Sequence, residues 1–336
     1  MTSLAAGRLE TFCERLGVSS PFTMERIRAG RNSEVMLVRN RQGEWILKRY
    51  YQHASDRRDR LGAELAFLTF LQDSGVSGVP RPLGADRDLG VGLYSFLPGA
   101  RPASVASAHV SQAAAFVREI NQQKRSANAQ RLPKAADACV SWQDHLDLTE
   151  SRLGQLLAVA PTAELEFEAQ AFVGQQLLPY WGEIKGKILD EVDRAELAGP
   201  IASANQIISP SDFGFHNTLE NAGRLSFVDF EYAGWDDPAK LICDFICQPE
   251  LPVSAGQGLQ FLEELLLDSP DSGAVGRRVK SLLPVHRVKW CCILLNEFKL
   301  EDRKRRSHAG VDSDGLLARQ LGKAKQYFGT HLASTH

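Results

Sequence analysis

Alternating apolar and polar positions predict short strands in the first hundred residues of the chain. The runs 34–39 and 44–50 are rich in residues that favour strands, and residues 40–43, which end in glycine, join them. This arrangement predicts a β-hairpin. The apolar run 91–96 predicts a further, buried strand. Residues 1–18 mix apolar with charged positions and predict a short amphipathic helix.

A helical pattern follows the hairpin and dominates from residue 110 onward. In the first helix Ser55 or Asp56 is the candidate N-cap, and Gly75 lies where a C-terminal cap is expected. The later helical pattern is interrupted between residues 206 and 230 by runs of strand length around the turn 221–223. Five further helices are predicted at residues 110–123, 142–157, 163–189, 258–267 and 286–300.

The change from strand to helix patterns near Pro98 and Gly99 predicts the domain organisation. A chain of 336 residues exceeds what one compact core normally holds. We therefore expect an α+β chain with two lobes and a ligand cleft between them. Residues 1–98 would form a small antiparallel-sheet lobe, and residues 99–336 a larger, mainly helical lobe.

Composition and charge narrow the classes of function. The 39 basic and 41 acidic residues give a net charge of −2, so no nucleic-acid partner is expected. No signal-peptide pattern and no apolar run near the roughly 20 residues of a membrane helix are present, so we expect a cytoplasmic protein without membrane association. Six cysteines occur in no disulfide-like spacing. Buried reduced thiols are the favoured interpretation, with Cys243 and Cys247 as alternative metal ligands on a helical face.

Candidate chemistry is concentrated in the segment that interrupts the helical pattern. Asp212 precedes Asn217 by five residues, and Asp229 ends the next strand-like run. If the two runs pair through the turn 221–223, Asn217 and Asp229 lie together at one end of a hairpin. Carboxylate and amide oxygens suit Mg²⁺ bound with nucleotide phosphates. Asp212 then remains to orient an acceptor hydroxyl and to take up its proton.

Partners for a phosphate group occur upstream. Lys48 ends the run 45–48 within the second strand of the predicted hairpin, and Glu64 lies in the helix that follows. An ion pair between them would fix the lysine near the α- and β-phosphates of a nucleotide. Ile46, two residues before Lys48, shares its face of the strand and can pack on the base. The loop 29–33 precedes the first hairpin strand, where its backbone N–H groups can cover the phosphates.

With these residues the chain resembles the aminoglycoside phosphotransferase and choline kinase-like superfamily, which has the protein-kinase fold. The resemblance covers about residues 26–245. It implies a bilobal protein-kinase-like fold, ATP and Mg²⁺ as cofactors, and a small molecule carrying a hydroxyl group as acceptor. The residue roles that it implies are Lys48 and Glu64 as phosphate anchor, Asp212 as catalytic base, Asn217 and Asp229 as metal ligands, Gly30, Asn32 and Ser33 in the phosphate loop, and Tyr94 and Phe96 in an interlobe hinge (94–97) that contacts adenine.

The sequence departs from this family pattern at several positions. Members usually carry histidine two residues before the catalytic aspartate and often two after it, where this chain has Pro210 and Gly214. The nearby His216 is a candidate support. Lys240 and Leu241 also replace residues common after the family's Asp-Pro turn, which indicates a divergent branch.

The favoured function is therefore Mg²⁺-requiring, ATP-dependent phosphorylation of a hydroxyl on a sugar, amino sugar, aminoglycoside-like compound or amino alcohol. One alternative is a nucleotide-binding pseudokinase with a regulatory role, which the replaced histidines suggest. A second is a metal-dependent hydrolase, which has no use for Lys48 and Glu64. Candidates for the lining of an acceptor pocket are Glu231, Asp236, Asp237, Asn296 and Glu297.

Overall fold

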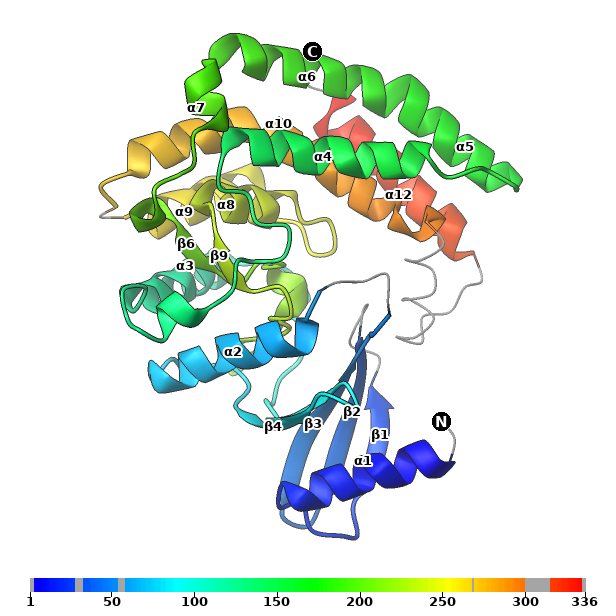
Figure 1. Ribbon diagram of the computed structural model, residues 1–336, viewed down its shortest axis with the longest axis vertical. Helices are drawn as coiled ribbons and strands as arrows, with labels where there is room; N and C mark the ends of the chain where they lie inside the picture. The colour runs from blue at the N-terminus through cyan, green and yellow to red at the C-terminus, as the bar shows by residue number, and fades with distance from the viewer. Residues whose placement is uncertain (1–2, 28–32, 54–57, 268, 300–314, 334–336) are drawn as a thin grey trace.

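The computed structural model describes residues 3–27, 33–53, 58–267, 269–299 and 315–333, which form two lobes (Figure 1). Within these residues the strands of the first lobe are β1 (Thr23–Ile27), β2 (Ser33–Asn40), β3 (Gly43–Tyr50), β4 (Pro82–Asp86) and β5 (Val91–Ser95). They form an antiparallel sheet in the order β1-β2-β3-β5-β4. The predicted hairpin and buried strand are confirmed. The edge strands β1 and β4 were not predicted, because β1 is largely exposed and β4 contains proline and glycine.

The two faces of this sheet pack against different neighbours. Helix α1 (Ser3–Arg15) crosses the outer face, where Phe12 and Cys13 join Val38, Leu47 and Leu93 in a small apolar core (Figure 1). The amphipathic helix expected at the start of the chain is thereby confirmed. Side chains alternate along a strand. The opposite face of β3 therefore presents its other residues toward the second lobe.

Helix α2 (Arg60–Asp73) lies between the sheet and the second lobe (Figure 1). Its apolar side belongs to the large core of the helical lobe, and the Phe67 ring lies 5.0 Å from the Phe230 ring. Asp59 is the N-cap and accepts a hydrogen bond from Gly62 N. The predicted caps Ser55 and Asp56 lie outside the described residues, and the described helix begins only at Arg60. Gly75 follows the C-cap with a φ of +74°, as its predicted place requires.

The second lobe is mainly helical, and its long helix α10 (Ser272–Leu294) packs against several of the other helices. The sequence pattern placed this helix at 286–300; Pro284 inside it interrupts the pattern, although Val279, Leu282 and Val288 are buried on both sides of the proline. The predicted helix 163–189 is divided by a π-helical turn at Val173–Leu177. The other helices described are α3 (Ser107–Gln122), α4 (Trp142–Leu157), α5 (Glu164–Phe172), α6 (Leu178–Glu191), α7 (Arg194–Ala198), α8 (Pro238–Cys247), α9 (Ala255–Leu265) and α12 (Leu316–His331).

Two short antiparallel sheets of two strands each, in the second lobe, hold the segment that interrupts the helical pattern. Strand β6 (Ile207–Ser209) pairs with β9 (Gly234–Asp236), and β7 (Thr218–Asn221) pairs with β8 (Arg224–Phe227). The β7–β8 turn is the predicted one, and Gly223 adopts a φ of +77° there. The loops after β6 and after β8 are consequently fixed at both ends.

All six cysteines are buried as free thiols, which confirms the favoured interpretation. Burial raises the pKa of Cys247 to about 12, so this thiol is protonated at neutral pH. No cysteine belongs to a potential metal-binding cluster in the part of the chain that the structure describes. No helix in that part is long and apolar enough to cross a membrane.

Candidate active site

A buried lysine joins the two lobes where the sheet faces the helical lobe. The Nζ atom of Lys48 lies 2.7 Å from Oε2 of Glu64 and 2.5 Å from Oδ1 of Asp229. It also lies 3.5 Å from Oε2 of Glu231. Lys48 and Glu64 belong to the first lobe, whereas Asp229 and Glu231 follow β8 in the second. The predicted ion pair between Lys48 and Glu64 is present, and it is extended by two carboxylates from the opposite lobe.

The local structure explains why these side chains meet. Ile46, Lys48 and Tyr50 share one face of β3 because side chains alternate along a strand. Glu64 lies one turn into α2, where its Oε1 accepts a hydrogen bond from Phe230 N at 3.2 Å. Asp229 has a φ of +70°, an uncommon conformation for a residue other than glycine. That turn directs Asp229 toward Lys48, and Phe230 enters the core.

The electrostatics of this cluster favour a cation. Carboxylate oxygens of Glu64, Asp229 and Glu231 lie within 4.8 Å of one another. Burial, together with the charges of Glu231 and Glu64, raises the pKa of Asp229 to about 6 against the opposing effect of Lys48. Burial alone would lower the pKa of Lys48, but the three carboxylates raise it well above its usual value. The lysine therefore stays charged, and the crowded acids suit a divalent cation.

The loop after β6 carries the predicted base and the predicted amide ligand. Asn217 Nδ2 donates to the backbone oxygen of Asp212 at 3.0 Å, and Asn217 O accepts from Val228 N at 3.0 Å. Asn217 is thereby tied both to Asp212 and to the residue before Asp229. The Asp212 side chain is 34% exposed, and His216 Nε2 lies 3.3 Å from its Oδ1. The five-residue spacing read from the sequence thus corresponds to one compact loop.

The remaining predicted nucleotide residues have different surroundings. Ser33 is buried, and its hydroxyl donates to Oε2 of Glu231 at 2.9 Å. Ile46 lies opposite Tyr94 in the β3–β5 register, and Phe96 is half-buried just after β5. Gly30 and Asn32 lie outside the described residues.

The side chain of Tyr94 makes contacts that the sequence did not indicate. Its ring is buried, and its hydroxyl lies 2.7 Å from that of Tyr50, which donates to Glu64 Oε2 at 2.6 Å. The side chain therefore belongs to a hydrogen-bond chain that ends on the Lys48–Glu64 pair. Tyr50 was missed as a site residue, and Glu231 was expected only in the lining of an acceptor pocket and not beside Lys48. The acid two positions after Asp229 was a usable signal for Glu231, whereas Tyr50 is recognisable only once the face of β3 is known.

Two of the predicted acceptor-lining acids serve a structural purpose instead. Asp236 and Asp237 are fully buried. Asp236 accepts from Lys240 Nζ at 2.7 Å, while Asp237 caps α8 and pairs with Arg278 at 2.8 Å. The expectation that these two acids line an acceptor pocket is wrong, because their oxygens are directed into the core of the lobe.

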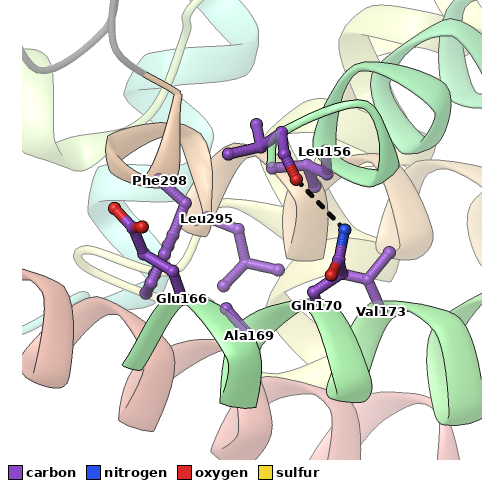
Figure 2. Close-up of a pocket in the computed structure, with 8 residues that line it drawn as sticks. Leu156, Glu166, Ala169, Gln170, Val173, Leu295 and Phe298 are labelled. Carbon is purple, nitrogen blue, oxygen red and sulfur yellow. Dashed lines mark hydrogen bonds between the residues drawn. The ribbon is translucent and has the colours of Figure 1, made fainter. Parts of the chain in front are cut away.

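A small pocket lies elsewhere in the helical lobe, between α4, α5 and the end of α10 (Figure 2). Its polar side chains are engaged locally: Glu166 accepts from Thr162 N at 2.8 Å, and Gln170 Nε2 donates to Val159 O at 3.1 Å. None of the cluster around Lys48 lines it. The pocket residues are Leu156, Val159, Glu166, Ala169, Gln170, Val173, Leu295 and Phe298.

Comparison with known proteins relates this geometry to a family. Residues 23–247 match the model of the phosphotransferase enzyme family. No curated protein sequence matches the chain. Among solved structures, a choline/ethanolamine kinase family protein from Mesorhizobium loti has a TM-score of 0.59 at 16% identity, covering 98% of this chain and 95% of that one.

Two further solved structures show the same fold. A choline kinase from Cryptosporidium parvum has a TM-score of 0.57 at 10% identity, with 97% of each chain covered. A spectinomycin phosphotransferase in complex with ADP and spectinomycin has a TM-score of 0.60 at 13% identity, covering 94% of this chain and 98% of that one. The family match thus covers the first lobe from β1 onward, the second lobe as far as α8, and every described residue of the Lys48 cluster, and the chain belongs to the phosphotransferase enzyme family.

Proposed function

We propose that this protein is an ATP-dependent, Mg²⁺-requiring kinase that phosphorylates a hydroxyl group of a small molecule. The acceptor classes are a sugar, an amino sugar, an aminoglycoside-like compound or an amino alcohol. The observation that carries the proposal is the contact of Lys48, which is paired with Glu64 in the first lobe, with Asp229 of the second lobe. A cation suited to bind phosphate and a carboxylate suited to bind a metal therefore lie side by side across the interlobe boundary, which supports the proposal.

Each residue then has a chemical task. Lys48, held by Glu64, binds the α- and β-phosphates, and Asn217 and Asp229 offer an amide and a carboxylate oxygen to Mg²⁺. When bound, Mg²⁺-ATP supplies the phosphoryl group and the neutralisation of its charge. Asp212 orients the acceptor hydroxyl and takes its proton, a role that its partly exposed carboxylate permits.

The nucleotide contacts belong mainly to the first lobe, residues 1–98. We assign Ile46 and Phe96 to the surroundings of the base, and Gly30, Asn32 and Ser33 to the phosphates. Tyr94 contributes to the hinge through its backbone, because its side chain is engaged with Tyr50.

A metal-dependent hydrolase would also use the acidic residues. It would have no task for a buried lysine that reaches across the lobes to its acids. The Lys48–Glu64 pair, held further by Tyr50, therefore favours phosphoryl transfer from a nucleotide.

The experiment is acceptor-dependent ADP formation with pooled sugars, amino sugars, amino alcohols and aminoglycosides. Wild type should form ADP with at least one pool, and Asp212→Ala should lower the turnover by roughly 100-fold or more. Asp190→Ala, at an exposed position of α6, is the matched control and should retain full turnover. Binding of Mg²⁺-ATP without turnover in any pool would contradict the kinase and favour a pseudokinase.

A further inference from the structure

Arg60 is the first residue of α2 and one of the largest fully buried side chains among the described residues. Only 1% of its side chain is exposed. A buried guanidinium is costly unless an anion compensates it. Because Arg60 precedes Glu64 by one helical turn, both side chains lie on the same face of α2. Its position alone therefore directs a second cation toward the cluster around Lys48.

The anion that faces Arg60 is Glu231. Arg60 Nε lies 3.6 Å from Glu231 Oε1, and it donates to the hydroxyl of Tyr232 at 3.4 Å. The other carboxylate oxygen of Glu231 accepts from Ser33 and lies 3.5 Å from Lys48 Nζ. Glu231, from the second lobe, is thus surrounded by three residues of the first lobe. Its two oxygens are divided between Arg60 on one side and Ser33 with Lys48 on the other.

The cluster around Lys48 holds more negative than positive charge, and Arg60 reduces this excess. Lys48 contacts three carboxylates, those of Glu64, Asp229 and Glu231, and one ammonium group cannot compensate all three. We infer that Arg60 is a positioning residue that compensates Glu231, so that Lys48 remains free to bind phosphate and Asp229 to bind metal. This inference rests on the proposed function. Without Arg60, Glu231 would compete with the phosphates for Lys48.

A neighbouring arginine provides a matched control. Arg58 lies two residues earlier, and its guanidinium lies 5.8 Å from the Tyr232 ring centre, compared with 5.6 Å for Arg60. Arg58, however, pairs with Asp137 at 3.1 Å, and 37% of its side chain is exposed. Both arginines contact the same aromatic ring, but only Arg60 has Glu231 as its partner. Comparing variants of the two arginines therefore distinguishes the loss of the charge that faces Glu231 from the loss of packing on Tyr232.

The test is calorimetric binding of adenylyl imidodiphosphate with Mg²⁺, which needs no acceptor. Arg60→Met should weaken binding by about tenfold in the wild-type background, but by less than about threefold when Glu231→Gln is also present. Arg58→Met should stay within about twofold of wild type. A role of Arg60 in packing alone would give the same loss in both backgrounds, since removing the charge of Glu231 would not rescue it.

Equal losses in the two backgrounds, or no loss for Arg60→Met, would overturn the inference while leaving the kinase proposal intact. Failure of the wild type itself to bind the Mg²⁺-nucleotide would instead overturn the proposed function. Circular dichroism first establishes that each variant is folded. If Arg60→Met is not, Arg60→Gln in both backgrounds replaces it, because glutamine keeps a donor for Tyr232 without the charge, and the same outcomes apply.

Discussion

The imidazole Nε2 of His216 lies 3.3 Å from Oδ1 of Asp212, four residues before it in the same loop. The His216 side chain is 11% exposed. Gly214 lies between the two residues, and a Cβ atom there would be 3.0 Å from His216 Nδ1 and 3.3 Å from Gln248 Cγ. The missing side chain at position 214 therefore makes room for the ring of His216. This supports the candidate role of His216 as a support for Asp212.

Gly214→Ala should consequently lower turnover by about tenfold, with little change in nucleotide binding. Gly214 has an extended backbone with a φ of 176°, so alanine is not excluded by conformation and acts only through its contacts. Displacement of His216 would disturb the orientation of Asp212. The measurement is the rate of ADP formation with the acceptor found in the pooled assay. Gly154→Ala is the control, since nothing lies within 4 Å of a Cβ in that place. Unchanged turnover in Gly214→Ala would show that His216 does not support Asp212.

Replacing Lys48 should increase the binding of Mg²⁺ by the three carboxylates that surround it. In Lys48→Met the carboxylates of Glu64, Asp229 and Glu231, which lie within 4.8 Å of one another in the wild type, lose their shared ammonium partner. We expect millimolar Mg²⁺ without nucleotide to raise the melting temperature of this variant by a few degrees more than that of wild type. Thermal unfolding with and without Mg²⁺ measures the difference.

The control for this prediction is the double variant Lys48→Met/Asp229→Asn, which removes one of the three charges. The additional Mg²⁺ effect should largely disappear in it. An equal Mg²⁺ effect in wild type and Lys48→Met would show that the acids do not bind the cation together.

The sequence was sufficient where local rules decide the structure. The hairpin around residues 40–43 follows from turn chemistry. The Asp212–Asn217 loop and the pairing of Lys48 with Glu64 were predicted instead from the order and spacing of these residues in the protein-kinase pattern. The start of α10 was missed because Pro284 breaks its apolar pattern, although tertiary packing holds the helix. Long-range pairing was also hidden: nothing near Arg60 in the chain indicates Glu231 as its neighbour.

For Asp236 and Asp237 the sequence led to the opposite error, because a function was predicted for residues that have a structural role. Two adjacent acids near a predicted catalytic loop look like functional residues in the sequence. Their partners Lys240 and Arg278 belong to α8 and α10, and only the packing of these helices reveals that the charges are compensated inside the lobe. Burial of paired charges is a property of the tertiary structure that hydropathy along the chain does not record.

The buried polar network beneath these acids should be essential for stability. Asp244 Oδ1 accepts from Trp290 Nε1 at 2.8 Å, lies 3.1 Å from His286 Nδ1 and contacts Lys289. Asp244→Asn would leave Lys289 buried with no full negative charge at that contact, which should cost about 3 kcal/mol in the free energy of unfolding. Urea unfolding at pH 7 measures this loss. Glu150→Gln is the control, because the Glu150–Lys185 pair is exposed and should contribute less than about 1 kcal/mol.

Acid should destabilise the protein through Asp237, because the pKa of this carboxyl is lower in the folded chain than in the unfolded chain. Burial acts to raise this pKa, but hydrogen bonds with His145 and Arg278 lower it from 3.8 to about 2. The unfolded chain therefore binds the proton more readily than the folded one. The contribution of Asp237 is fully present above the unfolded value of 3.8 and is lost as the pH falls through about 2. The difference corresponds to roughly 2 kcal/mol.

Asp237→Asn should accordingly lower the free energy of unfolding at pH 7 and flatten its decline between about pH 4 and pH 2. Urea titrations at a series of pH values give both quantities. Asp190→Asn is the reference variant, because its exposed carboxylate should leave the acid limb as in wild type. If Asp237→Asn loses stability toward acid as steeply as wild type does, other carboxylates are responsible for the acid limb. Asp137 is then the next candidate, because charges from Arg152 and Arg58 overcome its burial and lower its pKa to about 2.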